Sequence, residues 1–286
     1  MRGRAFDIAF GVGVALKLVV KKGKLSWNVT HECNRKCGHC HVETVAHGDE
    51  RNHLKWLPKN DACKVADELS RQKVTRVGIS GGEPLLVPYL EELVEYASRQ
   101  CGIELELATN GIFLTEEKVF RLAQHLKKAA TSLDYDDLRP LSVFGRGMSQ
   151  EQVVGKTISL FKQYGIPVEV KTILHRGGRA EEIIETVARK GASEIQLRQF
   201  FRTDGQVVPF TERFVTADEE FNEMADSLIG KYPNIKISKM SISDMLKYGC
   251  ISFDGSFYIY GKDKRPITHG NLLKDSLDIA AIHRSL

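Results

Sequence analysis

The 286-residue sequence contains no long, uninterrupted run of apolar residues. Its opening stretch, MRGRAFDIAFGVGVALKLVV, is interrupted by Asp7 and Lys17 and is followed by KKGK. A membrane-spanning helix needs about 20 consecutive apolar residues, and a secretory signal ends in a small-residue cleavage site, which this stretch lacks. We therefore expect residues 1–23 to form a leading amphipathic helix, and the protein to be cytoplasmic with no membrane partner.

The sequence also lacks a strong charge imbalance, since 41 basic residues against 37 acidic ones leave a formal charge of +4. This excess is too small to indicate nucleic-acid binding. A phosphate-binding loop is excluded as well, because Gly155-Lys156-Thr157 has Gln150 where the earlier glycine is required. The 42 % hydrophobic and 27 % charged residues are typical of a globular enzyme with a sizeable core.

Cysteine is scarce, but three of the six cysteines lie within CNRKCGHC, residues 33–40, with no fourth beside them. Thiols stay reduced in the cytosol, so structural disulfides are a poor explanation. Cys33, Cys37 and Cys40 can hold three irons of a [4Fe–4S] cluster and leave the fourth iron open to a small molecule. The alternative is zinc with His39 or His41 as fourth ligand, but structural zinc usually needs a second, separated ligand pair. The spacing therefore favours the iron–sulfur cluster.

Predicted strands and amphipathic helices alternate from residue 24 to residue 231, which indicates parallel βαβ units in an α/β fold. Six such strands are too few for a closed (β/α)8 barrel, so the sheet is either a partial barrel or open and doubly wound. The predicted strands are 24–30, 75–80, 103–109, 129–135, 167–174 and 193–200, and the predicted helices are 60–72, 86–99, 116–127, 149–164, 180–190 and 217–231.

Polar residues and glycines follow at or near the end of each strand, where both architectures bind ligands. They could therefore converge on one face of the sheet. These segments are Gly81-Gly82-Glu83, Thr109-Asn110-Gly111, Ser132-Leu133-Asp134, Lys171-Thr172 and Gln196-Leu197-Arg198.

Together with CNRKCGHC, the motifs SGGEP (80–84), ATNG (108–111) and SLD (132–134) resemble those of the radical S-adenosylmethionine (SAM) superfamily. The resemblance covers roughly residues 24–200 and implies a partial (β/α)6 TIM-like barrel with one [4Fe–4S] cluster. It implies that SAM chelates the open iron and is cleaved by one electron to methionine and a 5′-deoxyadenosyl radical, which abstracts hydrogen from a substrate. An electron donor such as flavodoxin or ferredoxin is implied as well.

The resemblance also implies roles for the strand-end residues. Gly81 and Gly82 would let the backbone approach SAM, and Glu83 would bind its amino group through a charge-assisted hydrogen bond. Arg146 would pair with the SAM carboxylate, and Lys171 is a second candidate. The remaining expected contacts are to the ribose (Thr109, Asn110, Ser132, Asp134), to adenine or substrate (Gln196, Arg198), and to adenine from His39, which replaces the family's usual bulky aromatic residue.

Residues 233–286 resemble a reduced SPASM or Twitch-type unit, a small α/β cap over the barrel mouth that follows a barrel domain over 24–232. A hairpin is predicted in CISFDGSFYIYG, with its turn at Asp254-Gly255. Cys250 is the only cysteine of this unit, and Tyr260 stands where another is expected, so we predict no auxiliary cluster. Cys250 could donate a hydrogen atom to a substrate radical, or it could be a buried free thiol.

The leading hypothesis is a radical SAM enzyme that modifies a peptide or natural-product intermediate, because radicals reach C–H bonds that acids and bases cannot activate. The alternatives are a radical epimerase using Cys250, a maturase for another enzyme's cofactor and, outside enzymes, a zinc-binding adaptor domain. The substrate is a small molecule or a peptide. Polar residues expected near the mouth, without an assigned target, are His41, Glu43, Tyr135, Arg198 and Arg202.

Overall fold

The computed structural model describes residues 25–35, 37, 39–40, 55–134, 149–200 and 214–284. The helix expected over residues 1–23 lies outside these ranges. Within them, no helix is both long enough and apolar enough to cross a membrane. The predicted site residue Arg146 and the mouth candidates His41, Glu43, Tyr135 and Arg202 also lie outside the described residues.

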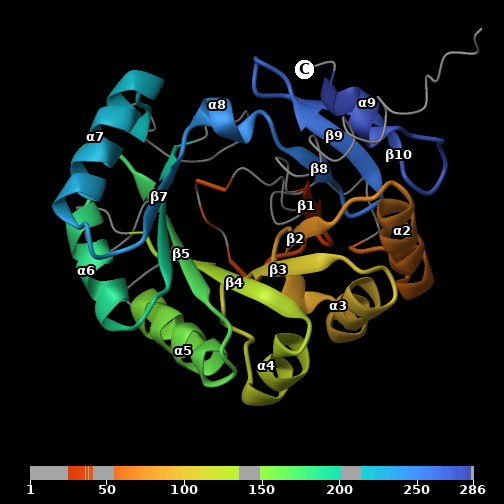
Figure 1. Cartoon of the computed structure of the whole chain (residues 1–286), viewed down its shortest axis with the longest axis horizontal. Helices are drawn as coiled ribbons and strands as arrows, with labels where there is room; N and C mark the ends of the chain where they lie inside the picture. The colour runs from red at the N-terminus through yellow and green to blue at the C-terminus, as the bar shows by residue number, and fades with distance from the viewer. Residues whose placement is uncertain are drawn as a thin grey trace, which may run out of the picture.

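Six consecutive strand–helix units form the body of the molecule, with the helices on the outer side of a curved sheet (Figure 1). Strands β1 to β6 pair in chain order and run parallel, which confirms the predicted α/β class. The units are β1 (Leu25–Asn28) with α2 (Lys59–Arg71), β2 (Arg76–Ser80) with α3 (Leu90–Arg99), β3 (Glu104–Ala108) with α4 (Glu116–Ala123), β4 (Leu126–Ser132) with α5 (Ser149–Gln163), β5 (Val168–Leu174) with α6 (Ala180–Arg189), and β6 (Glu194–Gln199) with α7 (Asp218–Lys231).

The C-terminal segment extends the same sheet at both ends. Strand β7 (Ile237–Met240) pairs parallel with β6 and continues the barrel wall. Helix α8 (Ile242–Met245) then leads to β8 (Gly249–Ile251), which pairs parallel with β1 at the opposite end of the wall. The sheet order is therefore β10-β9-β8-β1-β2-β3-β4-β5-β6-β7.

The predicted hairpin is present as β8 and β9 (Ser256–Tyr260), which are antiparallel, and β10 (Pro266–Asn271) adds a third strand. A short helix, α9 (Ile279–Arg284), follows these strands. The sheet is thus continuous across residue 233. The division into a barrel domain and a cap stays a prediction, but β7 belongs to the barrel wall.

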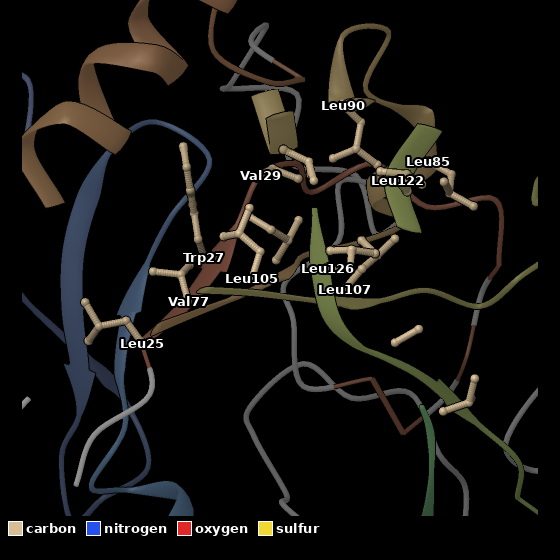
Figure 2. Close-up of a cluster of buried hydrophobic side chains, with 14 of the residues drawn as sticks. Leu25, Trp27, Val29, Val77, Leu85, Leu90, Leu105, Leu107, Leu122 and Leu126 are labelled. Carbon is tan, nitrogen blue, oxygen red and sulfur yellow. The ribbon is translucent and has the colours of Figure 1, made fainter. Parts of the chain in front are cut away.

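Successive side chains along each strand face either the hydrophobic core or the inside of the barrel. Leu25 and Trp27 of β1, with Leu105 and Leu107 of β3, are almost fully buried in the core. In Figure 2 these side chains cluster with residues such as Leu90 from α3. Burying one such side chain contributes roughly 1.5–3 kcal/mol. The intervening residues point into the barrel, because successive side chains of a strand face opposite sides.

Strand β4 begins three residues before its predicted start, and α4 ends four residues before its predicted end. Thr115 caps the start of α4, since its side chain accepts a hydrogen bond from the Lys118 backbone N–H at 3.2 Å. After Ala123 the chain forms a strand instead of continuing the helix, because Leu126 pairs with Leu105 and Lys128 pairs with Glu106 of β3. These long-range pairings override the local helical pattern.

Candidate active site

A cavity of about 190 Å³ lies at the carboxyl ends of the barrel strands. It is lined by residues from the cysteine segment and from the segments that follow β2, β3 and β4. The structure thus brings together twelve of the predicted site residues: Cys33, Cys37, His39, Cys40, Gly81, Gly82, Thr109, Asn110, Ser132, Asp134, Lys171 and Arg198. Of the other predicted residues within the described ranges, Glu83 is fully buried and bonded to the lining residues Thr109 and Asn110, whereas Gln196 and Cys250 line a second cavity.

The two glycines after β2 hold the cysteine segment against the sheet. The backbone N–H of Gly82 donates to the carbonyl of Thr30 at 2.8 Å, and that of Glu83 donates to the carbonyl of Glu32 at 2.7 Å. A Cβ on Gly81 would lie 2.3 Å from the Thr30 carbonyl oxygen, and one on Gly82 would lie 2.0 Å from that of Glu32. Neither backbone can yield, so only glycine fits these positions.

Glu83 connects the ends of β2 and β3. Its carboxylate accepts hydrogen bonds from the Thr109 hydroxyl at 2.6 Å, the Asn110 backbone at 2.7 Å and the Leu85 backbone at 3.1 Å. Burial raises the pKa of Glu83, while these hydrogen bonds oppose the rise. Because the side chain is fully buried, its observed role is to fix two strand ends, and its contact with SAM stays a prediction.

Asn110 joins the end of β3 to the cysteine segment. Its side-chain N–H₂ donates to Asn34 Oδ1 at 2.7 Å and contacts the Cys33 sulfur at 3.9 Å. Its Oδ1 accepts a hydrogen bond from the backbone of Ile112 at 3.0 Å, which closes a turn after the strand. Asn110 therefore positions the first cysteine. Its expected contact with a ribose stays a prediction.

Asp134 ties the end of β4 to two other parts of the site. One carboxylate oxygen accepts a hydrogen bond from the Ile173 backbone at 2.8 Å, and the other lies 3.7 Å from Nε2 of His39. Asp134 and His39 are both buried. The position that departs from the family's usual aromatic residue thus lies against the carboxylate that follows β4.

The three cysteines fit an iron–sulfur cluster. All three are free thiols and line one cavity. Within the described residues, no three His, Cys, Asp or Glu side chains converge on one point as ligands of a single metal ion. A cluster does not require such convergence, because each thiolate binds a different iron. Cys33, Cys37 and Cys40 would therefore hold the cluster.

A second, larger cavity of about 440 Å³ lies inside the barrel. Its walls are the inward-facing positions of the strands, and Gly78, Ala108 and Ala130 leave space on β2, β3 and β4 where barrel interiors are usually filled by branched residues. Both cavities are lined by Ser80, Ala108, Ala130, Lys171, Arg198 and Met245. A ligand in the larger cavity would therefore adjoin one in the smaller cavity.

One wall of the larger cavity carries a charge cluster that lies outside the set predicted from the sequence. Lys128 Nζ lies 2.9 Å from Glu169, 3.5 Å from Glu194 and 3.8 Å from Glu106. Burial lowers the pKa of Lys128, but the hydrogen bond and charge of Glu169, with the other two carboxylates, outweigh it and raise the pKa overall. Charged residues at alternate positions of strands that are otherwise apolar are the sequence signal for this cluster.

Cys250 lines the larger cavity but not the smaller one. It pairs with Ser26 of β1 and Tyr258 of β9, so it lies in the sheet beside the first strand. Strand β8 thus continues the sheet beyond β1, and the assignment of Cys250 to a cap over the mouth stays a prediction. Burial raises the pKa of its thiol to about 12, although a hydrogen bond with Tyr258 partly opposes this.

A model of the Radical SAM superfamily matches residues 27–189. An S-adenosylmethionine-dependent nucleotide dehydratase of Lacinutrix mariniflava is 23 % identical over 214 residues, which are 73 % of this chain and 45 % of the relative. A GTP 3′,8-cyclase of Peptoclostridium acidaminophilum is 28 % identical over 228 residues, which are 77 % of this chain and 66 % of the relative.

Solved structures share the fold at low sequence identity. Streptococcus suis SuiB bound to S-adenosylmethionine aligns with a TM-score of 0.64 and 15 % identity, over 91 % of this chain and 64 % of SuiB. The anSMEcpe structure with bound AdoMet aligns with a TM-score of 0.63 and 15 % identity, over 90 % and 79 % of the two chains. The chain spans about half to two thirds of the length of the curated relatives described above.

Proposed function

From the premise that this chain belongs to the radical SAM superfamily, we propose that it cleaves SAM reductively and directs the resulting radical at a molecule held inside the barrel. The observation that carries this proposal is the arrangement of the two cavities. Three free cysteines line the smaller one, and Lys171, Arg198 and Ala130 belong to both. A radical formed in the smaller cavity would thus face the larger one directly.

A [4Fe–4S] cluster on Cys33, Cys37 and Cys40 would supply one electron that breaks the bond between the SAM sulfur and its 5′ carbon, giving methionine and a 5′-deoxyadenosyl radical that takes a hydrogen atom from the substrate. The electron would come from a reduced flavodoxin or ferredoxin. The chain's own residues would bind and orient SAM. Asn110 holds the cysteine segment, and Lys171, which lines both cavities, would pair with the SAM carboxylate.

We place a small-molecule substrate ahead of a peptide. The larger cavity has the volume of a small-molecule site, and the two sequence relatives described above are named for nucleotide substrates. Peptide modification is supported only by a shared fold with structures such as SuiB bound to its precursor peptide SuiA. The volume of the larger cavity and the nucleotide substrates in the names of these relatives therefore favour a compact polar molecule.

Epimerisation is a second candidate, supported by the position of Cys250. Its thiol lines the larger cavity and stays protonated, as a hydrogen-atom donor must. In this reaction the substrate radical would take the hydrogen atom of the Cys250 S–H group and leave a thiyl radical. One electron from the donor protein and one solvent proton would restore the thiol.

The proposed function is tested by measuring 5′-deoxyadenosine. Protein reconstituted anaerobically with iron and sulfide should form it from SAM after reduction by dithionite. Cys37→Ala should abolish the product, whereas Cys63→Ala, which removes a free thiol of α2 outside both cavities, should not. A cluster-loaded wild type that forms no product would contradict the proposal. Protein that binds zinc and no iron would support the adaptor alternative.

A further inference from the structure

We propose that the larger cavity binds a small molecule that carries a carboxylate or phosphate group beside a hydroxyl or amino group, and that Arg198 is the residue that binds the anionic group. The inference rests on the proposed function, because it names the class of substrate that the radical would reach. It is carried by buried polar atoms on β6 and β7 that have no hydrogen-bond partner among the described residues.

Arg198 is a half-buried cation that forms no ion pair with a carboxylate of the described residues, although the negative charges of Glu169 and Asp134 act on it. Its Nη2 donates to the sulfur of Met240 at 3.1 Å, and its Nε has no hydrogen-bond partner within the part of the chain that the structure describes. A guanidinium cannot release its proton in a protein, so it cannot become neutral to escape burial. An unpaired buried charge is costly. A bound anion would remove this cost.

The other cations of the cavity are already engaged. Lys128 is surrounded by three carboxylates, and Lys171, which is proposed above to bind the SAM carboxylate, also lies 3.5 Å from Glu169. Arg76 also lies within ion-pair distance of two glutamates. Arg198 is therefore the cation of this cavity best placed to bind an anion brought by a ligand.

Two more polar groups without partners among the described residues lie two register positions before Arg198 and Met240. Gln196 of β6 pairs with Ser238 of β7, as Arg198 pairs with Met240. The side-chain oxygens of Gln196 and Ser238 are buried and lack hydrogen-bond partners among the described residues, and both residues line the larger cavity. An amide oxygen only accepts hydrogen bonds. The ligand should therefore carry an O–H or N–H donor close to its anionic group.

The position of Arg198 places this ligand beside the reactive centre. Arg198 and Lys171 line both cavities, whereas Gln196 and Ser238 line only the larger one. An anionic group at Arg198 would thus lie at the boundary, and the rest of the molecule would lie in the barrel. The anionic group would fix which C–H bond faces the smaller cavity.

Three matched probes test the inference: glycerol, glycerate and glycerol 3-phosphate. Binding is measured by ligand-observed saturation-transfer NMR with cluster-loaded, oxidised protein in the presence of SAM. Glycerate or glycerol 3-phosphate should bind and glycerol should not, and the two anions distinguish a carboxylate site from a phosphate site. Arg198→Gln should weaken binding by at least about tenfold, because hydrogen bonds to a buried charged group are strong.

Arg176→Gln is the matched control, since that arginine is exposed at the end of β5 and is already paired with Glu220. It should leave probe binding unchanged. Arg198→Lys keeps the charge but loses the planar fork, so it should restore part of the affinity. If Arg198→Gln does not fold, the comparison of glycerol with the two anions on the wild type still decides whether an anion site exists.

Two results would overturn the inference. One is a wild type that binds neither anion better than glycerol. The other is Arg198→Gln protein that binds the anions as the wild type does but has a raised KM for SAM, which would assign Arg198 to the cofactor. Both are distinguishable from failure of the proposed function, because 5′-deoxyadenosine formation without substrate is measured separately.

Discussion

At the scale of single residues, the environment of Cys250 determines which chemistry its thiol can perform. Burial in the larger cavity raises its pKa to about 12, so the thiol stays protonated at neutral pH. A protonated thiol is a poor nucleophile and a poor metal ligand, because both roles need the thiolate. It retains the S–H hydrogen that a substrate radical could take. The residue is thus suited to hydrogen-atom donation.

The raised pKa of Cys250 predicts a pH-dependent contribution to stability. Between its ordinary value near 9.0 and about 12, the folded chain retains a proton that the unfolded chain releases. Unfolding therefore becomes easier as the pH rises through this window. By about pH 9.5 the wild type should lose roughly 1 kcal/mol more unfolding free energy, relative to neutral pH, than Cys250→Ala. Urea unfolding of the anaerobic protein at both pH values measures this difference, and equal losses in the two proteins would contradict the assignment.

Residue types and spacing predict only part of what these residues do. CNRKCGHC is a local motif, and the structure places its three cysteines on one cavity as expected. The partners of Gly82 and Glu83 are not local, because they lie on the cysteine segment and after β3. Spacing within SGGEP therefore predicts that these residues matter, but not that they hold other parts of the site.

At the scale of elements, the loop after β2 and the segment after β1 act as one unit. Two backbone hydrogen bonds join them, and Val29 adds a third by donating to Ser80 at 3.0 Å. The cysteines begin one residue beyond the last of these contacts, at Cys33. Their placement therefore depends on how closely these two backbones approach each other.

Gly82→Ala should disrupt this approach and lower cluster content. The new Cβ would lie 2.0 Å from the carbonyl oxygen of Glu32, so the cysteine segment would have to move. Iron and sulfide per chain after reconstitution should fall severalfold. The control is Gly230→Ala in α7, where a new Cβ would meet no atom within 4 Å. This variant should leave the iron content unchanged. Full iron content in Gly82→Ala would show that the backbone contact does not position the cysteines.

Most strands and helices were predictable because their apolar and polar residues recur with a clear period, and the exceptions lack this pattern. The six predicted barrel strands and their helices are present, with small shifts at their ends. Strand β10 lies outside the prediction because PITHGN begins with proline and shows no apolar alternation, and its first four residues are exposed. Such an edge strand forms through pairing with β9, which local sequence does not encode.

At the scale of the whole molecule, the open barrel places two cavities end to end. Small residues on β2, β3 and β4 leave space inside the barrel, and the strand ends form the smaller cavity next to it. The alternation of strands and helices predicts the barrel and the face that carries the site. This alternation does not predict that β8 pairs with β1, because the paired residues, such as Ser26 and Cys250, lie far apart in the sequence. The larger cavity and the position of Cys250 depend on this long-range pairing.

The central claim is that SAM binds the open iron of a cluster held by Cys33, Cys37 and Cys40. The most direct test is the electron paramagnetic resonance spectrum of the dithionite-reduced, fully loaded protein, recorded with and without SAM. We expect a signal from the reduced cluster whose shape changes when SAM is added, because the SAM amino and carboxylate groups would become ligands of one iron. A spectrum that SAM leaves unchanged would contradict it.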